Sequence, residues 1–237
     1  HWAPTKPPAN SVVNLVDYTW PIEVSSRATC LDAPVAIFKG LVTKESCAAL
    51  AKTIHASVWV RAGHDGVRLH SPSAKTHSFR QTFFDQAAAN ALYAAMSKSL
   101  NQVFVATAAT PDLELGAAYR VVGVNPLFRV ISYAHDGTLV PHYDAPYKFD
   151  DKRQTEMSLV IAIETPPEGS TTSFVEDTRV AAGFTDAQPG DEFPKIADYT
   201  LHTGDALLFP HRLFHASLGA QPGKLILRTD IIVEKVC

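Results

Sequence analysis

The feature that most limits the fold is a succession of short apolar runs in the C-terminal half of the chain. From residue 127 onward the sequence contains LFRVISYA, TEMSLVIAIE, TSFVE, GDALLFP, FHASLG and KLILRTDIIVE. Gly, Pro and Asp stand between these runs. Several short strands separated by turn signals are typical of a β-sandwich or barrel. We therefore predict a β-rich core over residues 111–237.

The N-terminal half has a different pattern. Thr43 is suited to cap a helix over residues 44–57, in which Leu50 and Ile54 lie four residues apart. An Ala-rich stretch predicts a second helix over 85–104. The run APVAIFKGL before the first helix is β-like. We predict one domain, 1–237, in which a helical and mixed half, 1–110, supports the β core.

Composition excludes several classes of function. The net charge is −3 and no cluster of Lys and Arg stands out, so we expect no nucleic-acid partner. No apolar run approaches the roughly 18 residues of a membrane helix, so we expect no membrane partner. The chain has three cysteines, an odd number. Their spacing fits no zinc site, which favours free thiols in a reducing compartment and a cytoplasmic location.

The stretch RVISYAHDGTLVPHYDAPY carries the first candidate chemistry. His142 and Asp144 are two residues apart, and in an extended segment both side chains reach the same side. A second histidine, His215, follows in GDALLFPHRLFHAS. Two histidines and one carboxylate suit non-haem Fe(II), because they leave coordination positions open for reactants. The His-x-Asp pair alone is equally typical of a solvated strand end.

The last apolar run places a charge among hydrophobic neighbours. In KLILRTDIIVE, Leu225, Leu227 and Ile231 share one face, so Arg228 points to the opposite face. A buried arginine is unfavourable unless it meets an anion. Its planar, forked donors match a carboxylate, which makes the distal end of a dicarboxylate a natural partner.

Four motifs occur together over about residues 125–235: NPLFRVISYAHDGTLVPHYD, GSTTSF, GDALLFPHRLFHAS and GKLILRTDIIVE. In this order they resemble the Fe(II)/2-oxoglutarate-dependent dioxygenases, in particular the prolyl 4-hydroxylase-like branch. The resemblance implies a mainly β fold with flanking helices: a double-stranded β-helix (jelly-roll or cupin-like) barrel supported by N-terminal helices. It implies Fe(II), 2-oxoglutarate and O₂ as cofactors, with ascorbate in a supporting role, and release of succinate and CO₂.

The resemblance also implies roles for single residues. His142 and Asp144 match the first two iron ligands. His215 matches the third in preference to His211, because the motif places this ligand just before small residues such as Ala216. These three residues are the predicted catalytic and metal-binding group.

Two further residues are predicted to bind the cosubstrate. Arg228 matches the basic residue that binds the C5 carboxylate of 2-oxoglutarate, and Tyr133 matches a tyrosine that hydrogen-bonds it. Prolyl hydroxylases usually have Lys at the position assigned to Arg228, so the arginine favours a small-molecule substrate over peptidyl proline. Gly169-Ser170 departs from the Gly-Gly of the family, so the match of Thr172 and Phe174 is looser.

We expect hydroxylation of a small polar or anionic metabolite, such as an amino acid or biosynthetic intermediate. Arg80 and Arg129 are the candidate substrate-binding residues, and the charged segment 145–154 is a candidate lid. A solvated Arg80 and an ion pair between Arg129 and a buried carboxylate are the alternatives. Two other functions stay open: a cupin-like metalloenzyme that does not use 2-oxoglutarate, for which Arg228 would have no role, and a non-catalytic ligand-sensing barrel.

Overall fold

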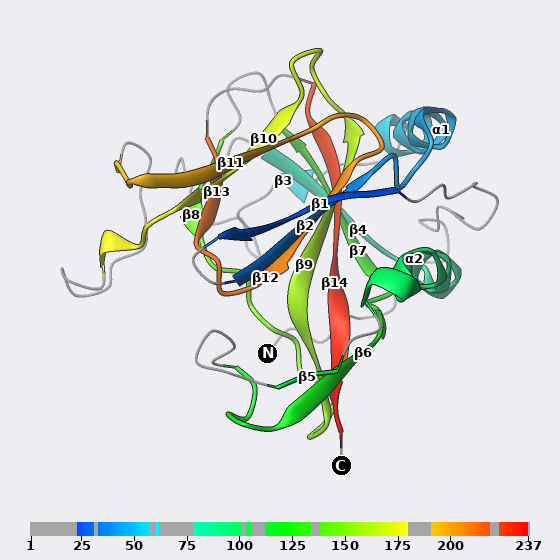
Figure 1. Cartoon of the computed structure of the whole chain (residues 1–237). Helices are drawn as coiled ribbons and strands as arrows, with labels where there is room; N and C mark the ends of the chain where they lie inside the picture. The colour runs from blue at the N-terminus through cyan, green and yellow to red at the C-terminus, as the bar shows by residue number, and fades with distance from the viewer. Residues whose placement is uncertain are drawn as a thin grey trace.

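The computed structural model describes residues 23–30, 33–56, 60–61, 78–100, 103–105, 112–133, 138–179, 191–218 and 223–236. In this part of the chain, a large and a small β-sheet pack face to face. Helices α1 (Lys44–His55) and α2 (Gln86–Leu100) lie on the outer side of the large sheet (Figure 1). Neither helix is long and apolar enough to cross a membrane.

The large sheet has the strand order β1-β2-β12-β9-β14-β7-β4-β3, and β6 pairs with β14 and β5. Its strands are β1 (Glu23–Cys30), β2 (Ala33–Lys39), β3 (Val60–Arg61), β4 (Ser78–Phe84), β5 (Val103–Val105), β6 (Ala118–Val124), β7 (Leu127–Tyr133), β9 (Arg153–Glu164), β12 (Ala206–Pro210) and β14 (Leu225–Lys235). The small sheet has the order β11-β10-β13-β8. Its strands are β8 (Leu139–His142), β10 (Ser170–Val175), β11 (Lys195–Leu201) and β13 (His215–Ser217).

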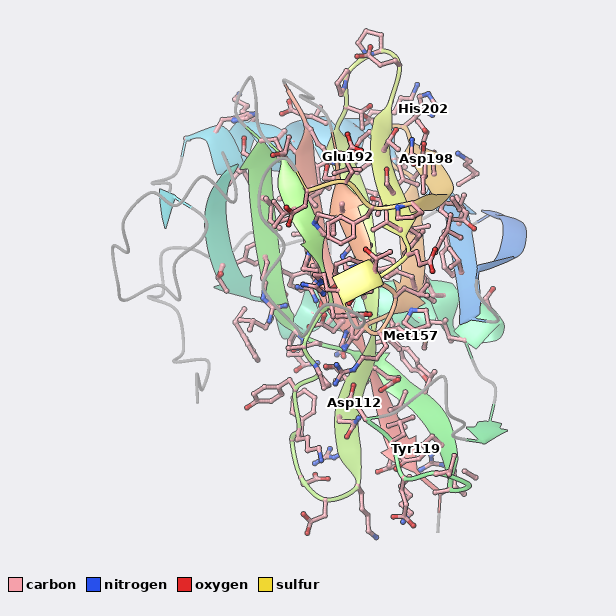
Figure 2. The ribbon with its side chains drawn as sticks, turned by 90° about the vertical axis from the view of Figure 1, so that its left-hand side faces the viewer. Asp112, Tyr119, Met157, Glu192, Asp198 and His202 are labelled. Atoms are coloured by element: carbon pink, nitrogen blue, oxygen red, sulfur yellow. The ribbon has the colours of Figure 1, made fainter. Side chains whose placement is uncertain are left out.

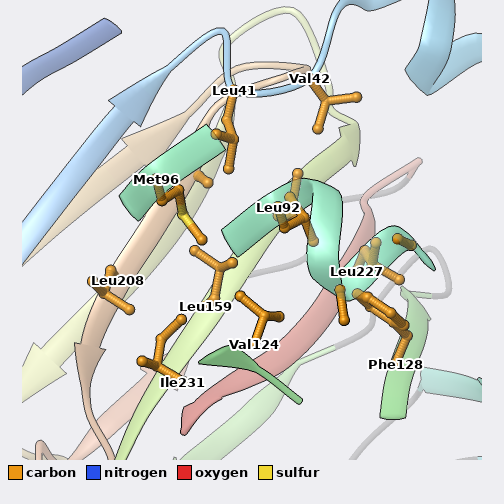
Figure 3. Close-up of a cluster of buried hydrophobic side chains, with 14 of the residues drawn as sticks. Leu41, Val42, Leu92, Met96, Val124, Phe128, Leu159, Leu208, Leu227 and Ile231 are labelled. Carbon is orange, nitrogen blue, oxygen red and sulfur yellow. The ribbon is translucent and has the colours of Figure 1, made fainter. Parts of the chain in front are cut away.

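Side chains along the central strands alternate between the two faces of the large sheet, so the buried hydrophobic residues form two clusters. Leu225, Leu227 and Ile231 of β14 are buried against the helices, in the cluster shown in Figure 3. Ile226 of the same strand lies in the second cluster, between the two sheets, with Phe174 and Phe209. The predicted alternation on this strand is therefore confirmed. The inner face of the barrel is the face that carries Arg228.

Local sequence explains where the helices begin. The Thr43 side chain accepts a hydrogen bond from the Ser46 backbone N–H at 3.2 Å, as an N-cap does. The first predicted helix is therefore confirmed at its start, and it ends at His55, two residues before the predicted end. Asp85 accepts from the Ala88 N–H at 2.9 Å at the start of α2. The predicted second helix is wrong at its end: α2 stops at Leu100, and β5 pairs with β6. Val and Phe residues at 103–105 favour this strand.

Strands from both halves of the chain build the large sheet. β2 pairs with β12, and β4 pairs with β7. The N-terminal half thus supplies strands to the barrel wall as well as helices. Three strands of the structure, β4, β6 and β11, were not predicted from the sequence. Residues 1–22 and 62–77 are among those outside the described part of the chain, so the single domain over 1–237 stays a prediction.

Candidate metal centre

Two neighbouring strands of the small sheet place the histidines. His142 ends β8 and His215 begins β13, and the two residues are paired across the strands. Their ring centroids are 4.4 Å apart. Asp144 follows His142 by two residues, and its backbone N–H donates to the His211 carbonyl at 3.1 Å. The predicted group is therefore brought together by strand pairing.

The three side chains converge on one point. One ligand atom from each of His142, Asp144 and His215 lies within 4.8 Å of the other two. The Asp144 Oδ1 atom is 3.6 Å from His142 Nε2, and Oδ2 is 3.7 Å from His215 Nε2. His211, the competing candidate, is not part of this group; its Nε2 lies 3.4 Å from Asp230 Oδ1. The structure places His215 where the motif predicted the third ligand.

Backbone carbonyls orient both imidazole rings. The Nδ1 atom of His142 is 2.9 Å from the Val140 carbonyl oxygen, and the Nδ1 atom of His215 is 2.8 Å from that of Leu213. Because a carbonyl oxygen only accepts, each Nδ1 carries a proton, and each Nε2 is the ring nitrogen that faces Asp144. This is the arrangement found in metal-binding histidines, where the second nitrogen is held by a hydrogen bond.

The protonation states also fit a cation. Burial, and after it the neighbouring His142, lower the pKa of His215 to about 3, so this imidazole is neutral. Burial alone would raise the pKa of Asp144, but the Arg228 guanidinium and the two histidines hold it well below its usual range. The neutral His215 imidazole and the ionised Asp144 carboxylate need release no proton to bind a divalent metal. The donor set therefore fits Fe(II).

Figure 2 shows where Met157, a residue of the central strand β9, lies within the molecule. Met157 lies near the middle of the view. Glu192, Asp198 and His202 are labelled above it, and Asp112 and Tyr119 are labelled below it. Ser158, the next residue on β9, donates a hydrogen bond to Asp144 Oδ2 at 2.5 Å. The group of His142, Asp144 and His215 is therefore linked to the central strands of the barrel by the hydrogen bond between Ser158 and Asp144.

Arg228 meets anions of the protein itself. Its Nη2 atom lies 3.0 Å from Asp144 Oδ2, 3.1 Å from Asp230 Oδ1 and 3.1 Å from Ser158 Oγ. The prediction that Arg228 points to the face opposite Leu227 is confirmed, and so is the expectation that it meets an anion. Its role toward 2-oxoglutarate stays a prediction, because both of these carboxylates belong to the protein.

Lys224 is a candidate that the sequence reasoning missed. It is 2% exposed, and its Nζ atom donates to Ser217 Oγ at 2.6 Å and to the Thr171 carbonyl at 3.2 Å. The same atom lies 4.8 Å from the centre of the Tyr133 ring. Among the described residues, no carboxylate lies within ion-pair distance of it, and burial lowers its pKa to about 7. Lys224 is thus a buried amine whose partners are neutral.

A signal for Lys224 was present in the sequence. The residue stands in the quoted motif GKLILRTDIIVE, four positions before Arg228. The resembling prolyl hydroxylases usually have Lys at the cosubstrate position. Tyr133, the other predicted cosubstrate residue, contacts Lys224, and its backbone N–H donates to the Lys224 carbonyl at 3.0 Å.

The two predicted substrate residues have different outcomes. Arg129 Nη1 lies 3.2 Å from Asp230 Oδ2, so the ion-pair alternative is confirmed, and the substrate role of Arg129 stays a prediction. Arg80 pairs through its backbone with Ile131 on β7. The side chain of Arg80 lies outside the described part of the structure, and its role also stays a prediction.

The candidate lid has a defined conformation. The Phe149 N–H donates to the Arg153 carbonyl at 2.9 Å, and the side chains of Asp150 and Arg153 form an ion pair at 2.7 Å. The Lys235 N–H donates to the Lys152 carbonyl at 2.9 Å, which attaches this turn to the end of β14. These contacts do not support the predicted closure over the site, which stays a prediction.

The GSTTSF motif supports the centre from β10. Phe174 is paired with His215 across β10 and β13, and its ring packs against Phe209 at a centroid distance of 5.2 Å. Gly169 has a φ of +93°, and a Cβ there would lie 2.5 Å from Thr200 Cγ2 and 2.9 Å from the Leu201 carbonyl oxygen. The turn that starts this strand therefore requires glycine.

Comparisons with known proteins were made by sequence and by structure. By sequence, no protein-family model and no curated protein matches the chain. By structure, the chain is similar to a prolyl-4-hydroxylase from Pseudomonas putida, with 12% identity, 83% of this chain and 91% of that chain covered, and a TM-score of 0.50. It is similar to OsALKBH1 with 14% identity, 83% and 97% coverage, and a TM-score of 0.50.

A third similar structure is a prolyl hydroxylase from Trichoplax adhaerens in complex with a peptide fragment of the hypoxia inducible factor oxygen degradation domain. It shows 12% identity, 83% and 82% coverage, and a TM-score of 0.50. These likenesses show the fold alone: the chain has the double-stranded β-helix fold of these solved structures. The predicted fold class is therefore confirmed. In this chain the fold brings together the group of His142, Asp144 and His215.

Proposed function

We propose that this chain is a non-haem iron oxygenase that uses 2-oxoglutarate and O₂ to oxidise, by hydroxylation, a small polar or anionic metabolite. The observation that carries the proposal is the convergence of His142, Asp144 and His215 inside this fold. Their two imidazoles and one carboxylate provide three ligands to Fe(II) and leave positions open for reactants. With Fe(II) bound, oxidative decarboxylation of 2-oxoglutarate by O₂ would supply the oxidant, yielding succinate, CO₂ and hydroxylated substrate.

We propose Lys224 as the residue that binds the distal carboxylate of 2-oxoglutarate. Lys224 donates to Ser217, which lies two residues beyond His215 on β13. Two residues along a strand span about 7 Å. A five-carbon dicarboxylate is long enough to reach from the metal group to this amine. Arg228, by contrast, already pairs with two carboxylates, so an added anion would gain less from its charge.

The lowered pKa of Lys224 predicts a pH-dependent affinity. Binding of an anion requires the protonated amine, which in the ligand-free protein loses its proton around pH 7. The affinity for 2-oxoglutarate should therefore fall about tenfold between pH 6 and pH 8, with uptake of a proton on binding. Calorimetry on anaerobic, Co(II)-loaded protein measures both quantities.

Lys224→Arg is the matched control, because arginine stays charged over this range and should give a flatter profile. If the wild-type protein and Lys224→Arg show the same pH dependence, Lys224 does not bind the carboxylate.

Support for the substrate class comes from the charges near the centre. Arg129 is only partly buried, at 21% of its side chain exposed, and lies on the strand next to Arg228. It is the described cation best placed to meet an anionic substrate, with Arg80 as the second candidate. The net charge of −3 disfavours a nucleic-acid substrate.

A substrate panel tests this class. We expect a small carboxylate to raise succinate release by the Fe(II)-loaded protein above the level without substrate. Stimulation by peptides or oligonucleotides alone would contradict the proposed substrate class and leave the iron chemistry in place.

A further inference from the structure

A chain of ion pairs begins at the metal-binding carboxylate and runs across the large sheet. Asp144 pairs with Arg228 at 3.0 Å, Arg228 with Asp230 at 3.1 Å, and Asp230 with Arg129 at 3.2 Å. The charges alternate in sign along this row. Strand pairing places the members next to one another, because Arg228 is paired with Arg129 and Asp230 is paired with Ser158.

One carboxylate oxygen of Asp144 has two polar partners, Ser158 and Arg228. Its Oδ2 atom accepts from Ser158 Oγ at 2.5 Å and lies 3.0 Å from Arg228 Nη2. Its Oδ1 atom faces His142 Nε2 at 3.6 Å. With Oδ2 held in this way, Oδ1 is the oxygen that remains for a cation. The contacts therefore favour binding through a single oxygen and fix the direction in which the carboxylate points.

Arg228 is itself held in place. Asp230 is 1% exposed, and it pairs with Arg228 on one side and with Arg129 on the other. The Asn125 side chain also donates to Asp230 Oδ2, at 3.4 Å. The two carboxylates and two guanidiniums of this row sum to zero charge, so Arg228 can hold Asp144 without a net positive charge that would repel a divalent metal.

We propose that Arg228 and Ser158 are positioning residues for the metal-binding carboxylate of Asp144, with Asp230 and Arg129 holding Arg228. The inference rests on the proposed function, since it assigns these residues to the same metal centre. It gives Arg228 a role distinct from that of a cosubstrate ligand. Partners that orient metal ligands typically change metal affinity about 10–100-fold when they are replaced.

The test is a Co(II) titration without 2-oxoglutarate, followed by the visible absorption of the bound ion. Ser158→Ala and Arg228→Gln should each bind Co(II) about 10–100-fold more weakly than the wild-type protein. Their Co(II) spectra should also change, because a freed carboxylate alters the ligand geometry. Arg228→Lys should recover part of the affinity, since it keeps the charge but not the fork.

Arg120→Gln is the matched control. Arg120 also pairs with a carboxylate, that of Glu234, but its side chain is 60% exposed, on β6. Its replacement should leave affinity and spectrum unchanged. Wild-type affinity and spectrum in both Ser158→Ala and Arg228→Gln would overturn the inference. Ser158→Ala decides the question if Arg228→Gln does not fold. A wild-type protein that binds no Co(II) would overturn the proposed function, and the positioning role with it.

Discussion

Replacement of His142, Asp144 or His215 by Ala is expected to weaken Fe(II) binding by more than about 100-fold and to abolish turnover. Each residue supplies one of three ligand atoms that lie within 4.8 Å of one another, and nearby groups that merely orient ligands already contribute about 10–100-fold. Equilibrium dialysis of the metal measures the effect. Thermal unfolding of the metal-free proteins checks that the variants fold.

Two other histidines make this experiment specific. His202 is exposed, and His202→Ala should bind metal as the wild-type protein does. His211 is fully buried beside Asp230, so His211→Ala is expected to lower stability but to keep the metal site. The assignment of His215 is wrong if His215→Ala binds metal normally while His211→Ala does not.

Replacement of Lys224 by Met is expected to raise the KM for 2-oxoglutarate at least about 30-fold. Removal of one partner from a buried charge pair typically costs about 2 kcal/mol or more, which corresponds to this factor. Met keeps the length of the side chain and removes only the charge and its donors. The KM is measured from succinate formation at saturating Fe(II), and Co(II) affinity without 2-oxoglutarate should stay at the wild-type level.

The comparison with Arg228→Gln separates the two cations. If Arg228 positions Asp144, its variant loses metal affinity first and recovers part of its activity when Fe(II) is raised. If instead Arg228→Gln raises the KM for 2-oxoglutarate at saturating Fe(II) and Lys224→Met does not, the assignment made from the sequence is right and Lys224 has no role in binding.

Much of the centre was predictable because its residues follow local rules. His142 and Asp144 share one side of an extended segment, and the motif around His215 identifies the third member. The direction of Arg228 also followed from alternation along one strand. Each of these inferences needs only the spacing within a single run of sequence.

The partners of Arg228 were not predictable in the same way. Its contacts with Asp144, Ser158 and Asp230 depend on which strands are neighbours and on their register. Lys224 shares the alternation of Ile226 and Arg228 in the run KLILRTDIIVE, but it was missed because its significance lies in having no carboxylate within ion-pair distance among the described residues. The pairing of strands, rather than the local sequence pattern, determines the partners of Arg228 and the surroundings of Lys224.

The same limit explains the errors in the fold. The strand β4, SFRQTFF, mixes polar and aromatic residues and was not recognised, although it pairs along its whole length with β7. The predicted second helix was extended over the first two residues of β5 (Val103–Val105), a short segment that pairs as a strand with β6. In both cases a neighbouring strand decides the conformation.

The most direct test of the central claim is the conversion of 2-oxoglutarate to succinate by the purified protein, without added substrate. We predict slow formation of succinate that requires both Fe(II) and O₂ and disappears in Asp144→Ala. Asp144→Ala removes the carboxylate ligand while both histidines remain. Absence of succinate in the wild-type protein with Fe(II) bound, or equal formation by Asp144→Ala, would contradict the account.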